Sequence, residues 1–257
     1  MLAARFENKT IIVTGGGSGI GRAIVARLVA EGGRVLAVDL HQSTLDESCA
    51  AANEYAVHGG KASSIAASVT DEQAVMALVR DFADNEGKLD VMINMAGILR
   101  SDHATELTLA HFRNVLEVNL LGTFLFCREA LPYLEKSGGN IVNCASTSSF
   151  FGTAYSAAYA ASKGGVAALT QTLAWEYMLR GVRVNAVAPG GIATPMTMGH
   201  SGNLPDNVDP TLFAHLLRPD MRFGDPADVA GAVAMLASED GRNINAVVLR
   251  VDGGVHG

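Results

Sequence analysis

The sequence predicts an α/β fold: a doubly wound, seven-stranded parallel sheet with helices on both faces. Seven short runs rich in apolar, often β-branched residues recur along the 257-residue chain, and longer stretches of helical character separate most of them. Most of these runs are apolar throughout, as expected for strands of a parallel sheet that is covered on both faces. A cluster of glycines directly after the first run is the third observation, because it indicates a tight connection from a strand into a helix.

The predicted strands are Thr10–Thr14, Arg34–Asp39, Ala62–Ala67, Asp90–Asn94, Asn140–Ala145, Arg183–Ala188 and Ala246–Val251. Helices are predicted over Ile20–Glu31, Asp71–Asn85, Leu109–Leu134 and Ala157–Leu179. Strands and helices that alternate in this way form right-handed βαβ units, from which a doubly wound sheet is built.

No linker or internal repeat divides the chain, so residues 1–257 are predicted to form one domain. The stretch 195–223 breaks the alternation, because it is rich in Gly and Pro and carries several Met, Leu and Phe side chains. A long insertion inside a compact domain is often a lid or a binding loop. The sequence Asp225-Pro226 then marks a new helix, with an Asp cap before a Pro at the first helical position.

The composition excludes several classes of protein. The formal net charge is -7 and no run of Lys or Arg is present, which argues against nucleic acid and against an anionic membrane surface as partners. The first residues lack the apolar core of a signal sequence, and no apolar stretch is long enough to span a membrane. Three scattered cysteines indicate free thiols in a reducing cytoplasm. The seven histidines show no metal-ligand spacing, so no metal site is predicted.

The glycine cluster reads Thr14-Gly15-Gly16-Gly17-Ser18-Gly19-Ile20-Gly21 and leads from the first strand into a helix. Glycines allow a positive φ and a close approach of the backbone to a pyrophosphate. The start of the helix offers free N–H groups and the positive end of the helix dipole to the phosphates. We therefore predict a Rossmann-like nucleotide-binding turn rather than a tight connection without a ligand.

Asp39 ends the second predicted strand, at the distance past the glycines where a carboxylate accepts hydrogen bonds from the adenosine ribose. The same charge would repel a 2′-phosphate, and neither Gly16–Ser18 nor the two positions after Asp39 contain an Arg or Lys that would neutralise one. NAD is therefore predicted in preference to NADP.

Further motifs follow in order along the chain: Asn94-Met95-Ala96-Gly97, Val118-Asn119-Leu120, Ser146, Tyr159 with Lys163, Pro189-Gly190, Thr194 and Val251-Asp252-Gly253-Gly254. With the glycine cluster, these motifs resemble the simple, single-domain branch of the short-chain dehydrogenase/reductase family over nearly the whole chain. The resemblance implies that the cofactor contacts Gly15, Ser18, Gly19, Ile20, Gly21, Asp39, Ser68, Val69, Asn94, Ala96, Gly97, Tyr159, Lys163, Pro189, Gly190, Ile192 and Thr194.

Two positions depart from the family pattern. Met95 stands where the family has an Asn whose amide helps to tie adjacent strands together. Ser68 stands where the family usually has an Asp that binds the adenine amino group. We expect looser recognition of adenine, with help from the backbone of Val69, rather than a loss of function.

Tyr159 and Lys163 lie four residues apart on a predicted helix, so their side chains share one face. A nearby ammonium stabilises a phenolate, which allows a tyrosine to take the proton of an alcohol or to return it. The resemblance implies that Lys163 also binds the nicotinamide ribose. It further implies that Ser146 bonds to the substrate oxygen and that Asn119 holds a water that links Lys163 to solvent.

The substrate is less well defined. Ser146, Phe151, Tyr155 and Met196 are the predicted substrate contacts, and the apolar residues around them suit a hydrophobic alcohol or ketone, alicyclic or steroid-like. Arg100 or His103 would instead meet a carboxylate or a phosphate. Leu116–Phe126 and Val166–Trp175 are unusually apolar, and the family commonly assembles through these helices, so we expect a homotetramer.

Several other functions are open. Epimerisation or dehydration on the same fold is usually accompanied by a longer C-terminal domain. Enoyl reduction uses Tyr and Lys at a wider spacing in this family. A 3-oxoacyl-thioester reductase usually prefers NADPH, which Asp39 opposes. A non-catalytic NAD-binding interaction protein would be expected to have lost Tyr159 or Lys163, and both are present.

Overall fold

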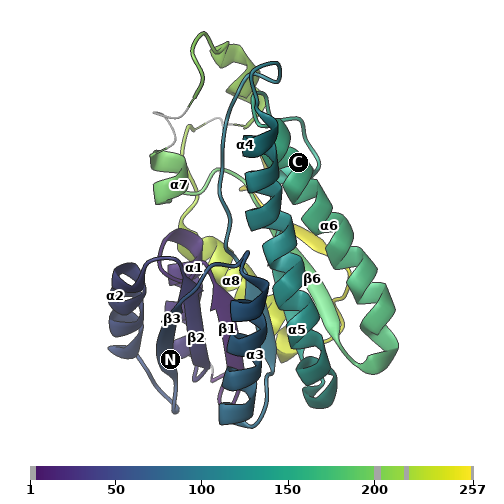
Figure 1. Ribbon diagram of the computed structural model, residues 1–257. Helices are drawn as coiled ribbons and strands as arrows, with labels where there is room; N and C mark the ends of the chain where they lie inside the picture. Colours follow the sequence, from purple (N-terminus) through teal and green to yellow (C-terminus); the bar gives the residue numbers. More distant parts are fainter. Residues whose placement is uncertain (1–3, 200–203, 217–219, 256–257) are drawn as a thin grey trace.

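The seven strands form a single parallel sheet in the order β3-β2-β1-β4-β5-β6-β7. The computed structural model describes residues 4–199, 204–216 and 220–255 (Figure 1). The strands are β1 (Thr10–Thr14), β2 (Arg34–Asp39), β3 (Lys61–Ala66), β4 (Val91–Asn94), β5 (Asn140–Cys144), β6 (Arg183–Pro189) and β7 (Val248–Val251). The predicted fold class and the seven strands are confirmed, with shifts of one or two residues at several strand ends.

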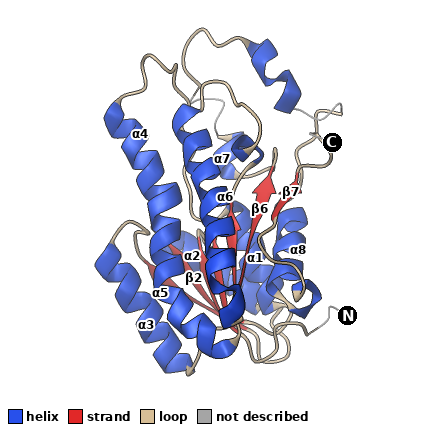
Figure 2. Cartoon of the chain, turned by 90° about the vertical axis from the view of Figure 1, so that its right-hand side faces the viewer, coloured by secondary structure: helices blue, strands red, loops and turns tan. Residues whose placement is uncertain are grey.

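The helices are α1 (Gly19–Val29), α2 (Gln42–Asn53), α3 (Glu72–Glu86), α4 (Leu109–Leu116), α5 (Gly122–Ser137), α6 (Ala157–Tyr177), α7 (Pro195–Met198) and α8 (Pro226–Ala237). The first core lies where α1, α2 and α8 pack on one face of the sheet. The second core lies under α3, α5 and α6 on the other face (Figures 1 and 2). The sheet is thus buried between two helical layers.

Burial explains why these segments form strands. All five residues of β1 are buried, as are all four of β4, so apolar side chains are favoured on both faces. The edge strand β3 is different: it has only one buried residue and carries Lys61, Ser63 and Ser64. The strand order reverses between β1 and β4, because the chain winds outward from β1 in both directions. A crevice at the carboxyl ends of the strands is expected at this reversal.

The predicted helix Leu109–Leu134 is interrupted. A π-helical turn at Glu117–Leu121 separates α4 from α5, and Asn119 lies within this turn. An apolar pattern does not reveal such a turn, because the turn adds one residue to the helix without changing which side chains are apolar.

Part of the predicted lid 195–223 lies outside the described residues, namely 200–203 and 217–219. The rest contains α7 and a 3₁₀ segment, Pro210–Leu216. Its ends are held together by a bridge between Ile192 and Gly224. Among the described residues, no helix is both long and apolar enough to cross a membrane.

Candidate active site

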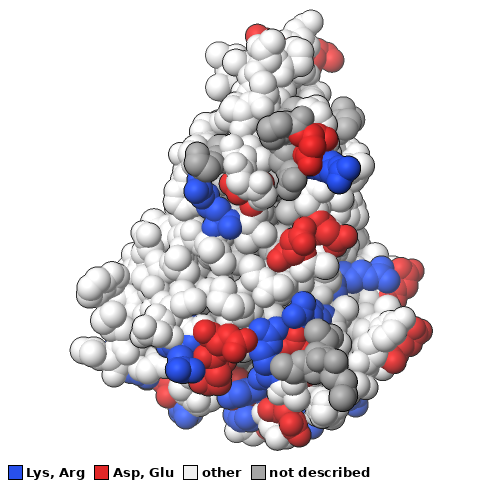
Figure 3. Space-filling view, turned by 180° about the vertical axis from the view of Figure 1, so that it is seen from behind, with Lys and Arg blue, Asp and Glu red and all other residues white. Residues whose placement is uncertain are grey.

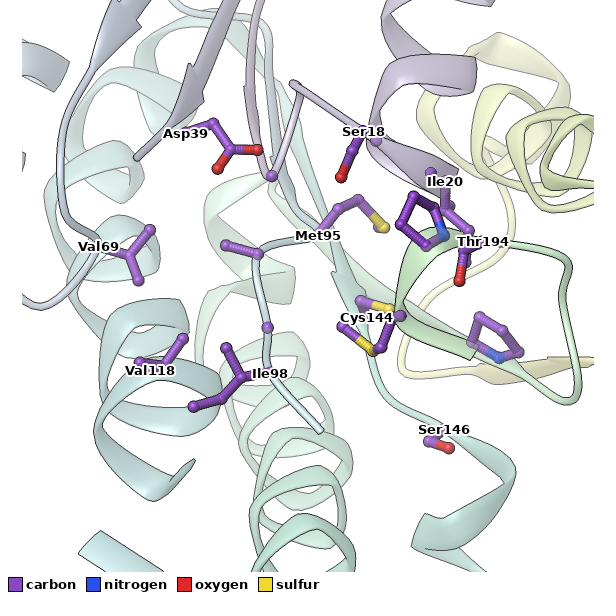
Figure 4. A pocket seen from close by; sticks show the side chains of 18 of the residues that line it. Ser18, Ile20, Asp39, Val69, Met95, Ile98, Val118, Cys144, Ser146 and Thr194 are labelled. Carbon is purple, nitrogen blue, oxygen red and sulfur yellow. The ribbon is translucent and has the colours of Figure 1, made fainter. Parts of the chain in front are cut away.

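A cleft opens at the carboxyl ends of the strands, where the loops after β1 to β6 meet (Figure 4). Most of the predicted site residues line it: Gly15, Ser18, Gly19, Ile20, Gly21, Asp39, Ser68, Val69, Ala96, Gly97, Ser146, Tyr159, Lys163, Pro189, Gly190, Ile192, Thr194 and Met196. The structure therefore brings together residues that are up to 181 positions apart in the sequence (Gly15 to Met196).

The backbone of the glycine loop is packed so closely that side chains at Gly15 and Gly21 would clash with neighbouring backbone atoms. Gly15 has φ +69°, and a Cβ placed there would lie 2.8 Å from the backbone N of Ala96. A Cβ on Gly21 would lie 2.0 Å from the carbonyl oxygen of Gly15, so the loop rests directly on the start of α1. Ser18 precedes α1 in an extended conformation and its side chain makes no capping hydrogen bond. The first backbone N–H groups of α1 are thus available to an anion in the cleft.

The carboxylate of Asp39 is held at the edge of this loop. One oxygen accepts a hydrogen bond from the backbone N–H of Gly17 at 3.0 Å, and the other accepts from Leu40 N–H at 2.7 Å. These two bonds fix the carboxylate next to the glycines. The position matches that expected for a carboxylate that accepts bonds from ribose hydroxyls.

Ser68 and Val69 both line the cleft. Figure 4 shows Val69 and Asp39 on one side of the cleft and Ser146 on the opposite side. The Ser68 hydroxyl accepts from the backbone N–H of Thr70 at 3.2 Å and is paired with the Thr70 hydroxyl at 2.8 Å. A Ser side chain occupied in this way is a weaker partner for a base than a free carboxylate would be.

Tyr159 and Lys163 both project from the first turns of α6 into the cleft. The Lys163 ammonium lies 5.8 Å from the centroid of the Tyr159 ring. The Lys163 side chain is almost completely buried, and its Nζ donates a hydrogen bond to the carbonyl oxygen of Cys144 at 2.7 Å. This bond gives the buried cation one hydrogen-bond partner and holds it beside the tyrosine.

Ser146 follows β5 and begins a short 3₁₀ turn, Thr147–Ser149. Its hydroxyl oxygen accepts from the backbone N–H of Ser148 at 3.2 Å, while Ser146 N–H donates to the Ser149 hydroxyl at 3.3 Å. The bond that it accepts fixes the oxygen, and a hydroxyl that accepts one bond can still donate its own hydrogen. The turn therefore fixes the position of the Ser146 oxygen and leaves its O–H group available as a hydrogen-bond donor.

Asn119 lies behind the cleft and does not line it. Its Oδ1 accepts from Ile98 N–H at 2.8 Å, and its Nδ2 donates to Ile98 O and to the Ser162 hydroxyl, both at 3.0 Å. Ile98 itself lines the cleft. The π-turn thus connects the loop after β4 with α6.

Asn94 is also buried behind the cleft. Its Nδ2 donates to Oδ1 of Asn143 at 2.9 Å, and this bond joins β4 to β5. The backbone N–H groups of Met95 and Ala96 donate to the Thr14 hydroxyl at 3.1 and 3.2 Å, which joins β4 to β1. Adjacent strands are therefore connected without an Asn at position 95, and the residue Met95 lines the cleft instead.

Phe151 and Tyr155 are not among the residues that line the cleft. The Phe151 ring lies 5.7 Å from the guanidinium of Arg250. The Tyr155 hydroxyl instead accepts from the backbone N–H of Asp209, at 2.9 Å.

Several residues that line the cleft were not among the predicted site residues: Leu40, His41, Ala67, Met95, Val118, Cys144 and Ala145. Except for Val118, each of them lies within two positions of a predicted site residue at the end of a strand. The available signal was the strand end itself, because every residue there reaches the same edge of the sheet.

Residues 15–256 match the family model described as "Enoyl-(Acyl carrier protein) reductase", a model of short-chain dehydrogenases/reductases. Levodione reductase of Leifsonia aquatica is 38% identical over 97% of this chain and 95% of its own length. L-fucose dehydrogenase of Bos taurus is 38% identical over 93% of this chain and 86% of its own length. A short-chain dehydrogenase from Mycobacterium paratuberculosis, solved bound to NAD, superimposes with a TM-score of 0.89 at 26% identity, covering 98% of each chain.

The fold and the cleft are those of an oxidoreductase with a dinucleotide-binding α/β domain. The chain belongs to the short-chain dehydrogenase/reductase family.

Proposed function

We propose that the protein is an NAD-dependent oxidoreductase that interconverts a secondary alcohol and a ketone. The observation that carries the proposal is that Tyr159, Lys163 and Ser146 line the same cleft as the glycine loop and Asp39. One part of the cleft fits a dinucleotide, and the other part offers the groups of an acid–base reaction. Bound NAD supplies the redox chemistry at the substrate carbon.

Tyr159 is the proposed acid/base: it takes the hydroxyl proton of the alcohol in oxidation and returns it in reduction. The ammonium of Lys163, near the tyrosine ring, favours the phenolate through its charge. Ser146 donates a hydrogen bond to the substrate oxygen, where negative charge develops. Asn119 and Lys163 flank Gly97, which supports a relay in which a water held by Asn119 passes protons between Lys163 and solvent.

Three observations support NAD as the cofactor. The amides at the start of α1 face the cleft and suit a pyrophosphate. Asp39, anchored by Gly17 and Leu40, suits ribose hydroxyls and opposes a 2′-phosphate. The relative from Mycobacterium paratuberculosis was solved with NAD bound.

A neutral, hydrophobic substrate, alicyclic or steroid-like, is proposed because the two side chains that could bind an anionic group already have partners. Arg100 makes two hydrogen bonds to Asp102, at 2.8 and 3.0 Å, and His103 Nε2 bonds to the carbonyl of Asp206 at 2.8 Å. These two side chains are therefore poor candidates for a substrate carboxylate or phosphate. Met196 lines the cleft and is 39% exposed, so it offers an apolar contact to a hydrophobic substrate.

The second candidate is a 3-oxoacyl-thioester reductase. It is supported by the description of the matching family model, which names a reductase of substrates carried by an acyl carrier protein. Asp39 opposes the NADPH that such enzymes usually prefer. Enoyl reduction itself is opposed by the four-residue spacing of Tyr159 and Lys163.

The test is an absorbance assay for reduced nicotinamide with a panel of hydrophobic secondary alcohols and the matching ketones, each with NAD(H) and NADP(H). We expect turnover with NAD and not with NADP. The variant Tyr159→Phe should lower kcat by about 10²–10⁴-fold, because it removes the acid/base, while NAD still binds. Undiminished turnover by this variant would contradict the mechanism, and a preference for NADP would contradict the role of Asp39.

A further inference from the structure

Tyr155 lies at a point where three separate segments meet. Its hydroxyl accepts from the backbone N–H of Asp209 at 2.9 Å, and its carbonyl oxygen accepts from the N–H of Asp102 at 2.8 Å. Asp102 belongs to the loop after β4, Tyr155 to the loop before α6, and Asp209 to the insertion that follows α7. One residue therefore connects the two loops beside the cleft with the segment Leu204–Leu216.

Ring contacts and two histidines reinforce this connection. The Tyr155 ring lies 5.0 Å from the His103 ring, edge to face, and 5.8 Å from the Phe213 ring. His103 Nε2 bonds to the carbonyl of Asp206 at 2.8 Å, and His215 Nε2 bonds to the carbonyl of Gly152 at 2.7 Å. One end of Leu204–Leu216 is thus attached to the loop after β4, and the other end to the loop before α6 that contains Tyr155.

The backbone of Tyr155 is adapted to this role. Its φ is +61°, a backbone conformation that residues other than Gly and Asn seldom adopt. The bond from Asp102 holds this conformation, which directs the side chain to the segment Leu204–Leu216. Figures 1 and 2 show that segment above the carboxyl edge of the sheet, over the loops that follow β4 and β5.

We infer that Tyr155 is a positioning residue that holds Leu204–Leu216 over the substrate end of the cleft and so determines how well a bulky substrate is bound. It acts through the segment rather than by contact with the reacting atoms. The inference rests on the proposed function for its kinetic consequence, but the attachment itself is a property of the fold.

The test compares Tyr155→Phe, which removes the hydroxyl and keeps the ring, with Tyr55→Phe, an exposed tyrosine elsewhere. We expect the KM for a bulky hydrophobic alcohol to rise about three- to tenfold, as for one lost hydrogen bond, while kcat for a small alcohol and the Kd for NAD stay unchanged. Phe213→Ala, which removes the ring contact from the other side, should give the same pattern.

Hydrogen exchange gives a readout that needs no turnover. In Tyr155→Phe the amide of Asp209 should exchange about tenfold faster, because its acceptor is gone, while the amide of Asp102 stays protected by the unchanged backbone of residue 155. Unchanged exchange at Asp209, or an equal loss of kcat with all substrates, would overturn the inference. If wild-type protein turned over no alcohol or ketone but showed the exchange result, the proposed function would fail and the attachment would stand.

Discussion

Gly97 shows how little space the candidate active site leaves around its charged group. A Cβ at this position would lie 3.2 Å from Oδ1 of Asn119 and 3.4 Å from Nζ of Lys163. The glycine therefore separates the amide that fixes Ile98 from the ammonium beside Tyr159. Absence of a side chain here keeps both groups where the proposed proton relay needs them.

Gly97→Ala is expected to displace Lys163 or Asn119 by a few tenths of an ångström. Overpacking of this kind typically destabilises a fold by about 1–3 kcal/mol. We expect a loss of kcat of about tenfold that exceeds any change in the Kd for NAD, measured by steady-state kinetics and calorimetry. Gly152→Ala, where a Cβ meets nothing within 4 Å, is the matched control. Equal kcat in the two variants would argue against a crowded relay.

The individual residues differ in how well the sequence predicts them. Residues fixed by a motif, such as Asp39, Tyr159 and Lys163, line the cleft, and their contacts with cofactor and substrate stay predictions. Tyr155 is a predicted substrate contact, but it does not line the cleft: its φ is +61° and its hydroxyl accepts a hydrogen bond from Asp209 N–H. A backbone conformation of this kind depends on contacts with distant segments, which a local pattern does not contain.

At the scale of elements, the hydrophobic pattern of the sequence predicts the strands and most helices, but it does not predict where a helix is interrupted. The apolar pattern through Leu109–Leu134 is continuous, yet the π-turn at Glu117–Leu121 divides it. The bonds of Asn119 to Ile98 and Ser162 are tertiary, so the turn is stabilised by partners far away in the sequence.

The end of α1 carries a group whose charge stabilises the fold. Glu31 is buried and accepts hydrogen bonds from Arg5, at 2.6 and 2.8 Å, and from Arg27. Burial alone would raise the pKa of Glu31, but the hydrogen bonds from Arg5 and Arg27 outweigh burial and hold this pKa below its usual range. The cluster ties the N-terminal segment to α1.

We therefore expect Glu31→Gln to lower the free energy of unfolding near pH 7 by about 2 kcal/mol. This loss is smaller than that expected for a fully buried ion pair, because both arginines are partly exposed. A depressed pKa stabilises the fold above the unfolded-state value near 4.3, and this contribution is lost as the pH falls through the lower folded-state pKa. Denaturant unfolding from pH 7 to pH 3 should show the difference from wild type shrinking below about pH 4. Asp81→Asn, in an exposed pair with Arg80, should change little.

At the scale of the whole molecule, many ion pairs gather at one end of the sheet. Ion pairs such as Arg5–Glu31, Arg34–Glu86 and Lys88–Asp90 lie near the amino ends of the strands. Figure 3 shows most of the charged side chains of this face in the lower half of the molecule, with smaller charged groups above them. At the end of α6, Trp175 is 70% exposed and Leu179, in the turn that follows, is 96% exposed.

Exposed large apolar side chains on neighbouring turns are typical of a subunit interface. We expect the protein to be a homotetramer, and expect the double variant Trp175→Glu/Leu179→Glu to dissociate it, because the charges would be buried without partners. Sedimentation velocity measures the change. Tyr55→Glu, on an exposed tyrosine after α2, should leave the assembly intact. A wild-type monomer at micromolar concentration would refute the expectation.

The central position of β1 also has a consequence for synthesis on the ribosome. One edge of β1 pairs with β2 soon after both emerge, but the other pairs with β4, where Ile11 lies opposite Val91, 80 residues later. At about 5–20 residues per second, that edge waits roughly 4–16 s for its neighbour. During this interval the nascent chain presents an apolar, unpaired strand, so this is the stage at which chaperones would have most to protect.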